Sequence, residues 1–154
     1  MSNSGIGFIG LGQMGLGMAN NLGRVASPFY AYDALPDATG RLSGDDIIIA
    51  SSVSSMAENC HLIFLCLPSA KEVKEVIFGA GGIANSALPN LSIIDTSTID
   101  RIEAISIHNQ LANQGITYAD CPISGLPFRA EDGTLTMMFG GRRELFNVTK
   151  RELD

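Results

Sequence analysis

A glycine-rich stretch near the start of the chain, "GFIGLGQMGLGMANNL" (7–22), constrains the fold more than any other feature. An apolar run at residues 5–9 is too short for a helix and leads directly into the glycines, which is typical of a buried strand. The residues after the glycines place their large apolar side chains at helical spacing, which predicts a helix to about residue 26. These side chains are Met14, Met18, Leu22 and Val25.

Each of the three glycines in the GxGxxG pattern has a separate use. Gly10 permits a tight turn, Gly12 lets a pyrophosphate approach the backbone, and Gly15 allows the helix to pack closely on the strand. The free N–H groups and partial positive charge of the helix N-terminus then favour phosphate binding. A glycine turn that only reverses the chain is the alternative. The residues predicted to contact a dinucleotide here are Gly10, Leu11, Gly12, Gln13, Met14 and Gly15.

An acidic residue completes the pattern. Asp33 ends a second predicted strand (29–33), about 20 residues beyond the glycines, where a carboxylate can accept hydrogen bonds from both ribose hydroxyls. The same carboxylate repels a 2′-phosphate, and neither Ala34 nor Leu35 can bind one. The sequence therefore favours NAD over NADP. The alternative is an aspartate that only caps a turn or helix before "LPDAT".

The rest of the chain alternates between strand and helix patterns. Alternation at this spacing predicts parallel βαβ units, and hence an α/β fold with a Rossmann-like, doubly wound, mostly parallel sheet and helices on both faces. Asp100 and Glu103 have the spacing of a capping pair at the start of one helix. The 154 residues are expected to form one domain, 1–154. Further strands are predicted at 45–52, 62–68, 91–95, 116–122 and 133–141, and further helices at 52–59, 70–79 and 100–114.

Composition excludes several classes of function. A net charge of -6 without a basic run argues against a nucleic-acid partner. No apolar run approaches the about 18–20 residues that span a bilayer, and the start of the chain does not resemble a signal peptide. The three cysteines show no metal-ligand spacing and fit a reducing compartment. No metal is expected, and the expected location is the cytoplasm.

Several blocks together resemble the β-hydroxyacid dehydrogenase family, nearest to its 3-hydroxyisobutyrate dehydrogenases. They are the glycine stretch, "CLPSAKEVKEVIFGAGGI", "IIDTSTID", and "YADCPISG" followed by "GTLTMMFGG". The resemblance implies an oxidoreductase that transfers hydride from a short 3-hydroxy acid to NAD. It also supports NAD as the cofactor, because NADP-using relatives typically carry Asn-Arg where Asp33 and Ala34 stand.

The resemblance implies further site residues. Leu67 and Pro68 correspond to a pair that contacts the cofactor, and Thr98 to a hydroxyl beside the nicotinamide ribose. A turn or cap opening the next helix is an equal alternative for Thr98. Ser124 and Gly125 correspond to the substrate-binding segment. Here the chain departs from the family pattern, because Leu126-Pro127 replaces a glycine: leucine resists positive φ, and proline has no N–H to donate.

The family's catalytic lysine is implied on a helix beyond the cofactor domain. The lysines of this chain, Lys71, Lys74 and Lys150, occur in no such motif, and pairing of the first two with Glu72 or Glu75 is expected. No catalytic residue is therefore expected in this chain, and the helical C-terminal domain is absent from it. It is interpreted as a truncated cofactor domain, a short form completed by a partner chain, or a non-catalytic dinucleotide-binding or interaction module. Self-association through exposed apolar surface is also expected.

Overall fold

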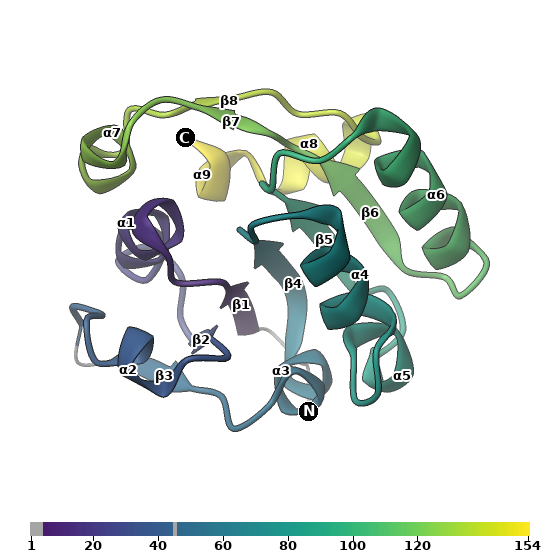
Figure 1. Cartoon of the computed structure of the whole chain (residues 1–154), viewed down its shortest axis with the longest axis horizontal. Helices are drawn as coiled ribbons and strands as arrows, with labels where there is room; N and C mark the ends of the chain where they lie inside the picture. Colours follow the sequence, from purple (N-terminus) through teal and green to yellow (C-terminus); the bar gives the residue numbers. More distant parts are fainter. Residues whose placement is uncertain (1–4, 45) are drawn as a thin grey trace.

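A six-stranded parallel sheet forms the centre of the computed structural model, which describes residues 5–44 and 46–154 (Figure 1). Its strand order is β3-β2-β1-β4-β5-β6. A separate two-stranded antiparallel ribbon pairs β7 with β8. The strands are β1 Gly5–Ile9, β2 Phe29–Tyr32, β3 Ile47–Ile49, β4 Cys60–Leu65, β5 Ser92–Asp95, β6 Thr117–Asp120, β7 Ile123–Ser124 and β8 Thr136–Met137.

Helices cover both faces of the sheet, as the sequence predicted. Side chains of α3 to α6 pack into the apolar core on one face, and side chains of α1, α2 and α8 pack into the core on the other. The helices are α1 Gln13–Leu22, α2 Pro36–Thr39, α3 Val53–Asn59, α4 Ala70–Phe78, α5 Ile83–Ser86, α6 Arg101–Ala112, α7 Pro127–Asp132, α8 Arg143–Val148 and α9 Lys150–Leu153.

Burial on both faces explains why the central strands read as continuous apolar runs. Every residue of β1 is buried, and in β4 only His61 is exposed. Phe8 and Phe64, which face each other in the β1–β4 register, stack with their ring centroids 6.3 Å apart. This central pair of strands fixes the position of the loops that follow it.

The strand order reverses between β1 and β4. From β1 the chain proceeds to β2 and β3 on one side, and from β4 it proceeds to β5 and β6 on the other. In parallel sheets of this kind, ligands bind outside the carboxyl ends of the strands where the order reverses. The glycine turn after β1 and the Leu67-Pro68 segment after β4 both lie at this switch point.

Several strand predictions were wrong in extent. The strand predicted at 116–122 ends at Asp120, shortly before Pro122, which has no N–H for a ladder. Residues 133–141 do not form a seventh long strand: they contribute only β8 and a single antiparallel bridge from Gly140 to Asp120. The strand predicted at 45–52 is limited to β3, and its first residue lies outside the described part of the chain.

Helix boundaries and faces also differ in places. The first helix ends at Leu22 with Gly23 as its C-cap, and Val25 is exposed beyond it. In α6 the buried face carries Ala104, Ile107 and Leu111, whereas Ile105 is exposed. The short helices α2, α5 and α7 were not predicted, because four to six residues are too few to show a helical period.

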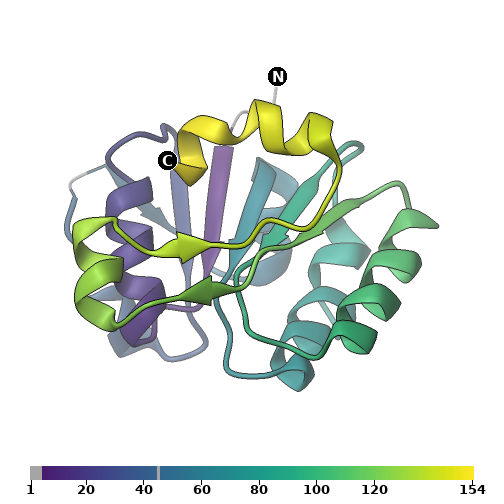
Figure 2. The same cartoon turned by 90° about the horizontal axis from the view of Figure 1, so that it is seen from above.

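Helix α7 packs closely against α1, and the β7–β8 ribbon leads to it (Figures 1 and 2). A Cβ atom on Gly17 would lie 2.7 Å from the carbonyl carbon of Ala130, so only glycine permits this approach. The Nδ2 of Asn21 donates to the carbonyl oxygens of Ala130 and Glu131 at 2.8 and 3.2 Å. Sequence reasoning gave no role to these α1 residues.

Candidate dinucleotide-binding site

Two of the three motif glycines are required by the fold itself. Gly10 has φ of 100°, and a Cβ atom there would overlap the carbonyl oxygen of Cys66 at the end of β4. A Cβ atom on Gly15 would overlap the carbonyl oxygen of Gly10, so any side chain would push α1 away from the turn. The turn is therefore held tightly against both β1 and β4.

Gly12 differs from its neighbours because the fold does not need it. Its φ of -68° suits any residue, it is exposed, and a Cβ atom there would meet nothing within 4 Å. A glycine that neither the backbone conformation nor the packing requires leaves open space directly above the loop. That open space is what the close approach of a pyrophosphate to the backbone needs.

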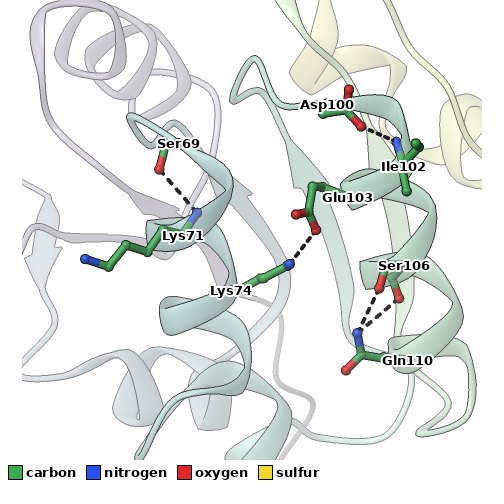
Figure 3. A network of polar contacts seen from close by, with 8 residues as sticks. All are labelled: Ser69, Lys71, Lys74, Asp100, Ile102, Glu103, Ser106 and Gln110. Carbon is green, nitrogen blue, oxygen red and sulfur yellow. Dashed lines mark hydrogen bonds and ion pairs between the residues drawn. The ribbon is translucent and has the colours of Figure 1, made fainter.

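The start of α1 is also left open. Gly12 is its N-cap without a side-chain hydrogen bond, no acidic residue occupies the first turn, and the first helical bond runs from the Leu16 N–H to the Gly12 carbonyl at 3.0 Å. The preceding amides thus have no acceptor within the helix. By contrast, Ser69 and Asp100 cap α4 and α6, as Figure 3 shows. The first turn of α1 is suited to an anion.

Asp33 follows β2 directly and contacts the glycine turn. Its Oδ2 accepts from the Leu11 N–H at 2.6 Å, and its Oδ1 accepts from the Leu35 N–H at 2.8 Å. The second bond is the turn-capping role considered as the alternative, so both interpretations describe real contacts. A carboxylate has about four acceptor positions, and two remain for ribose hydroxyls.

Arg41 is a residue of this region that sequence reasoning missed. It lies just beyond α2, and its Nη2 donates to the carbonyl oxygen of Leu11 at 2.8 Å. The residues that directly follow Asp33, Ala34 and Leu35, carry no positive charge, but the fold brings Arg41 back to the glycine turn. A local sequence pattern cannot predict this contact, because Arg41 and Leu11 are 30 residues apart in the sequence.

The segment after β4 contacts the same turn. A Cβ atom on Gly10 would lie 3.0 Å from the Cδ2 of Leu67, and the Leu67 N–H donates to the Oγ of Ser97 at 2.9 Å. Ser97 is buried and was not predicted, whereas its neighbour Thr98 is exposed. Pro68 is exposed beside Leu67. The structure thus brings Gly10 and Leu67 together, and Ser97 joins the ends of β4 and β5.

Buried acidic groups lie behind these strand ends. The Asp95 carboxylate accepts from the Ser97 N–H at 2.9 Å and from the Tyr118 hydroxyl at 2.8 Å. Burial raises the pKa of the Asp95 carboxyl. Burial, and then the negative charge of Asp95, raise the pKa of Asp120, whose Oδ1 is buried without a hydrogen-bond partner in the described part of the chain.

The predicted substrate segment lies at the end of β7 and in the residue that follows it. Ser124 is exposed in β7, opposite Thr136 of β8. Gly125 has φ of 148°, whereas Leu126 is extended with φ of -112° and Pro127 opens α7. Leu126 therefore avoids positive φ, as expected for leucine. The packing of α7 on α1 connects this segment with the helix of the glycine turn.

The expected pairing of Lys74 within its own helix was wrong. Lys74 on α4 forms an ion pair with Glu103 on α6 and not with a glutamate of its own helix (Figure 3). The predicted capping pair is correspondingly incomplete: Asp100 accepts from the Ile102 N–H at 2.7 Å, while Glu103 points to Lys74. Lys71 is exposed on α4, and Lys150 is exposed on α9.

A cavity of about 360 Å³ lies away from the glycine turn, at the C-terminal half of α1. Its lining includes Met18, Leu22, Ala130 and Leu153. Within residues 5–44 and 46–154, no group of three or more His, Cys, Asp or Glu side chains is arranged to hold a metal ion. None of the helices described there is long and apolar enough to cross a membrane.

The doubly wound sheet, the glycine turn and the acid after β2 define a dinucleotide-binding domain. The chain belongs to the family described as the NAD binding domain of 6-phosphogluconate dehydrogenase, whose model matches residues 5–154. It is 35% identical over 153 residues to the mitochondrial 3-hydroxyisobutyrate dehydrogenase of Mus musculus, covering 99% of this chain and 46% of that protein.

Solved structures show the same likeness. The 3-hydroxyisobutyrate dehydrogenase of Mycobacterium tuberculosis, solved with L-serine, has a TM-score of 0.90 at 25% identity, covering 97% of this chain and 50% of that one. Psf3 in complex with NADP+ and 2-OPP has a TM-score of 0.88 at 25% identity, covering 96% and 52%. The chain thus spans about half the length of the relatives it matches. The family and the fold implied by the sequence are confirmed.

Proposed function

We propose that this chain binds NAD across the β1–β4 switch point and is the cofactor domain of a dehydrogenase for short 3-hydroxy acids. The observation that carries the proposal is Gly12, which is open to solvent and not required by the fold. It stands between an uncapped helix start and the Asp33 carboxylate. Together they provide backbone N–H donors for a pyrophosphate and acceptors for a ribose.

NAD is proposed as the preferred dinucleotide because of Asp33. Its carboxylate already contacts the turn through the Leu11 N–H, and its free acceptor positions suit two hydroxyl donors. A phosphate on the same ribose would bring a second negative charge to that carboxylate. The preference is proposed for this chain, while Psf3 is described with NADP+.

Bound NAD supplies a hydride acceptor for oxidation of the substrate hydroxyl carbon. The residues of this chain bind and orient the dinucleotide: the turn at its pyrophosphate, Asp33 at its adenosine ribose, and Leu67, Pro68 and Thr98 toward its nicotinamide end. Ser124 and Gly125 are proposed to contact the hydroxy acid. The lysines lie on α4 and α9 with no role in this site, so we propose that removal of the hydroxyl proton needs a further domain or partner chain.

The cofactor preference is tested with Asp33→Asn, which keeps the size of the side chain and removes its charge. Titration of the chain and the variant with NADH and NADPH is expected to show tighter NADH binding by the parent chain. In the variant, the preference for NADH should fall by about tenfold or more. Tighter binding of NADPH by the parent chain would contradict the proposed role of Asp33.

A non-catalytic dinucleotide-binding module is the second candidate. It is favoured by Leu126 and Pro127, which place an extended residue and a helix start where the family pattern has a glycine. An assay of the full-length gene product with short 3-hydroxy acids and NAD separates the two. NADH formation supports the dehydrogenase, and dinucleotide binding without turnover of any 3-hydroxy acid supports the module.

The proposed location is the cytoplasm. Three free cysteines, two of them buried, fit a reducing compartment. The mouse relative is described as mitochondrial, so fractionation of cells that express the full-length protein is the appropriate test. Recovery in an organelle fraction would contradict the proposal.

A further inference from the structure

The backbone of Leu11, in the glycine turn, forms hydrogen bonds to two side chains of opposite charge. The Asp33 carboxylate accepts from its N–H at 2.6 Å, and the Arg41 guanidinium donates to its carbonyl oxygen at 2.8 Å. The side chain of Leu11 is fully buried, which fixes the residue between them. Because both side chains contact Leu11, Arg41 lies in the same part of the site as Asp33, beside the proposed position of the ribose.

No carboxylate in the described part of the chain forms an ion pair with the Arg41 guanidinium. Among the described residues the ion pair is that of Lys74 with Glu103, so Asp33 and Arg41 share Leu11 without forming one. A guanidinium carries five N–H donors, and the Leu11 carbonyl uses one of them. The side chain is exposed, so its other donors are available to a ligand.

We propose that Arg41 determines how well the site accepts a phosphate on the adenosine 2′ position. The inference rests on the proposed dinucleotide function and deepens it. The guanidinium offsets the repulsion between Asp33 and a 2′-phosphate, so the chain binds NADP as well as NAD, with NAD preferred. Arginine suits this role because its planar fork matches phosphate geometry.

Support of the turn is the competing role for Arg41. A residue that only holds the Leu11 carbonyl affects every dinucleotide equally, because the pyrophosphate contacts the turn in all of them. A residue that also contacts a 2′-phosphate affects only ligands that carry one. The ratio of the affinities for NADH and NADPH therefore distinguishes contact with a 2′-phosphate from support of the turn. This holds even if a variant weakens the binding of both dinucleotides.

The test is titration of the chain with NADH and NADPH, and with AMP and adenosine 2′,5′-bisphosphate as probes of the adenosine end. The variants are Arg41→Ala and Arg41→Lys, with Arg24→Ala as the matched control. Arg24 is also exposed, but it donates to the Oδ1 of Asn21 at the far end of α1. The control removes the same net charge without altering the turn.

Arg41→Ala is expected to weaken NADPH and the bisphosphate by about tenfold or more, and NADH and AMP by less than about threefold. Arg41→Lys should recover part of the loss, since it keeps the charge, and Arg24→Ala should leave the ratio unchanged. Equal weakening of NADH and NADPH, or an unchanged ratio in Arg41→Ala, would overturn the inference. If the parent chain binds NADPH but not NADH, Asp33 is misassigned; if it binds neither, the proposed function fails and this inference with it.

Discussion

The glycines of the turn occupy similar places in the sequence but meet different constraints. Gly10 and Gly15 are held by the carbonyl groups of Cys66 and Gly10, while Gly12 has open space where a side chain would stand. Gly10 and Gly15 therefore serve the fold, whereas the open space at Gly12 suits the proposed pyrophosphate contact. Asp33 and Arg41 then act on the residue between Gly10 and Gly12.

Alanine substitutions are predicted to separate these roles. Gly15→Ala should lower the free energy of unfolding by about 2 kcal/mol or more, because its Cβ atom meets backbone. Gly12→Ala should change it by no more than about 0.5 kcal/mol and yet weaken NADH binding by about tenfold or more. Urea denaturation and NADH titration measure the two effects. Unchanged NADH affinity in Gly12→Ala would count against a pyrophosphate at this position.

Asp120 provides a prediction of pH dependence. Because its pKa in the folded chain is raised above the ordinary value of 3.8, folding favours the protonated carboxyl. Its contribution to stability is present below that value and is lost as pH rises through the folded pKa. Asp120→Asn should therefore be more stable than the parent at pH 7, with the difference vanishing near pH 3 to 4.

Denaturation of both chains across this pH range checks the sign. Asp37→Asn is the matched control, because Asp37 is exposed in the first turn of α2. A lower stability of Asp120→Asn at pH 7, or a difference that does not depend on pH, would contradict the assignment of a destabilising buried charge.

At the scale of elements, the joint between α1 and α7 connects the cofactor site with the predicted substrate segment. α1 begins at the glycine turn, and α7 begins at Pro127, separated from Gly125 only by Leu126. Gly17 and Asn21 hold the two helices together. A substitution that alters the contact between α1 and α7 should therefore affect both the glycine turn and the predicted substrate segment.

Gly17→Ala is predicted to disrupt the joint. Its Cβ atom would lie 2.8 Å from the Glu131 backbone nitrogen, which cannot move without displacing α7. We expect a loss of about 2 kcal/mol in the free energy of unfolding and faster amide hydrogen exchange in α7. Equal protection of α7 in the variant and the parent would show that the contact is not needed to hold the helix.

The sequence predicted those strands and helices whose own residues show a clear apolar run or a helical period. β1, β4 and β5 are buried apolar runs, and Asp33 is placed by its distance from the glycines, so both the sheet and the centre of the site could be predicted. The ribbon and α7 were not, because two-residue strands and a six-residue helix carry no period. Arg41 and Ser97 were missed because each bonds to a peptide group about thirty residues away, which only the fold brings near.

At the scale of the whole molecule, the described chain is one doubly wound sheet with apolar side chains left on its surface. Leu126 and Phe128 are exposed around the start of α7, and Phe146 and Val148 are exposed on α8. The relatives of this chain are about twice as long. We propose that a further domain or a second copy covers part of this surface.

Self-association is the corresponding prediction. Sedimentation of the 154-residue chain should show a weight-average mass that rises with concentration above 16.3 kDa. Phe128→Ser with Val148→Ser should reduce this rise, because both exposed side chains become polar. A chain that stays monomeric at high concentration would show that this surface is tolerated by itself.

The central claim is that a dinucleotide lies on the glycine turn, and amide chemical shifts measured by NMR during titration with NADH test it most directly. The account predicts that the largest changes occur at residues 10–15 and 33–35, with smaller ones at Cys66 and Leu67. Changes confined to the cavity at the other end of α1, around Met18, Leu22 and Leu153, would contradict it.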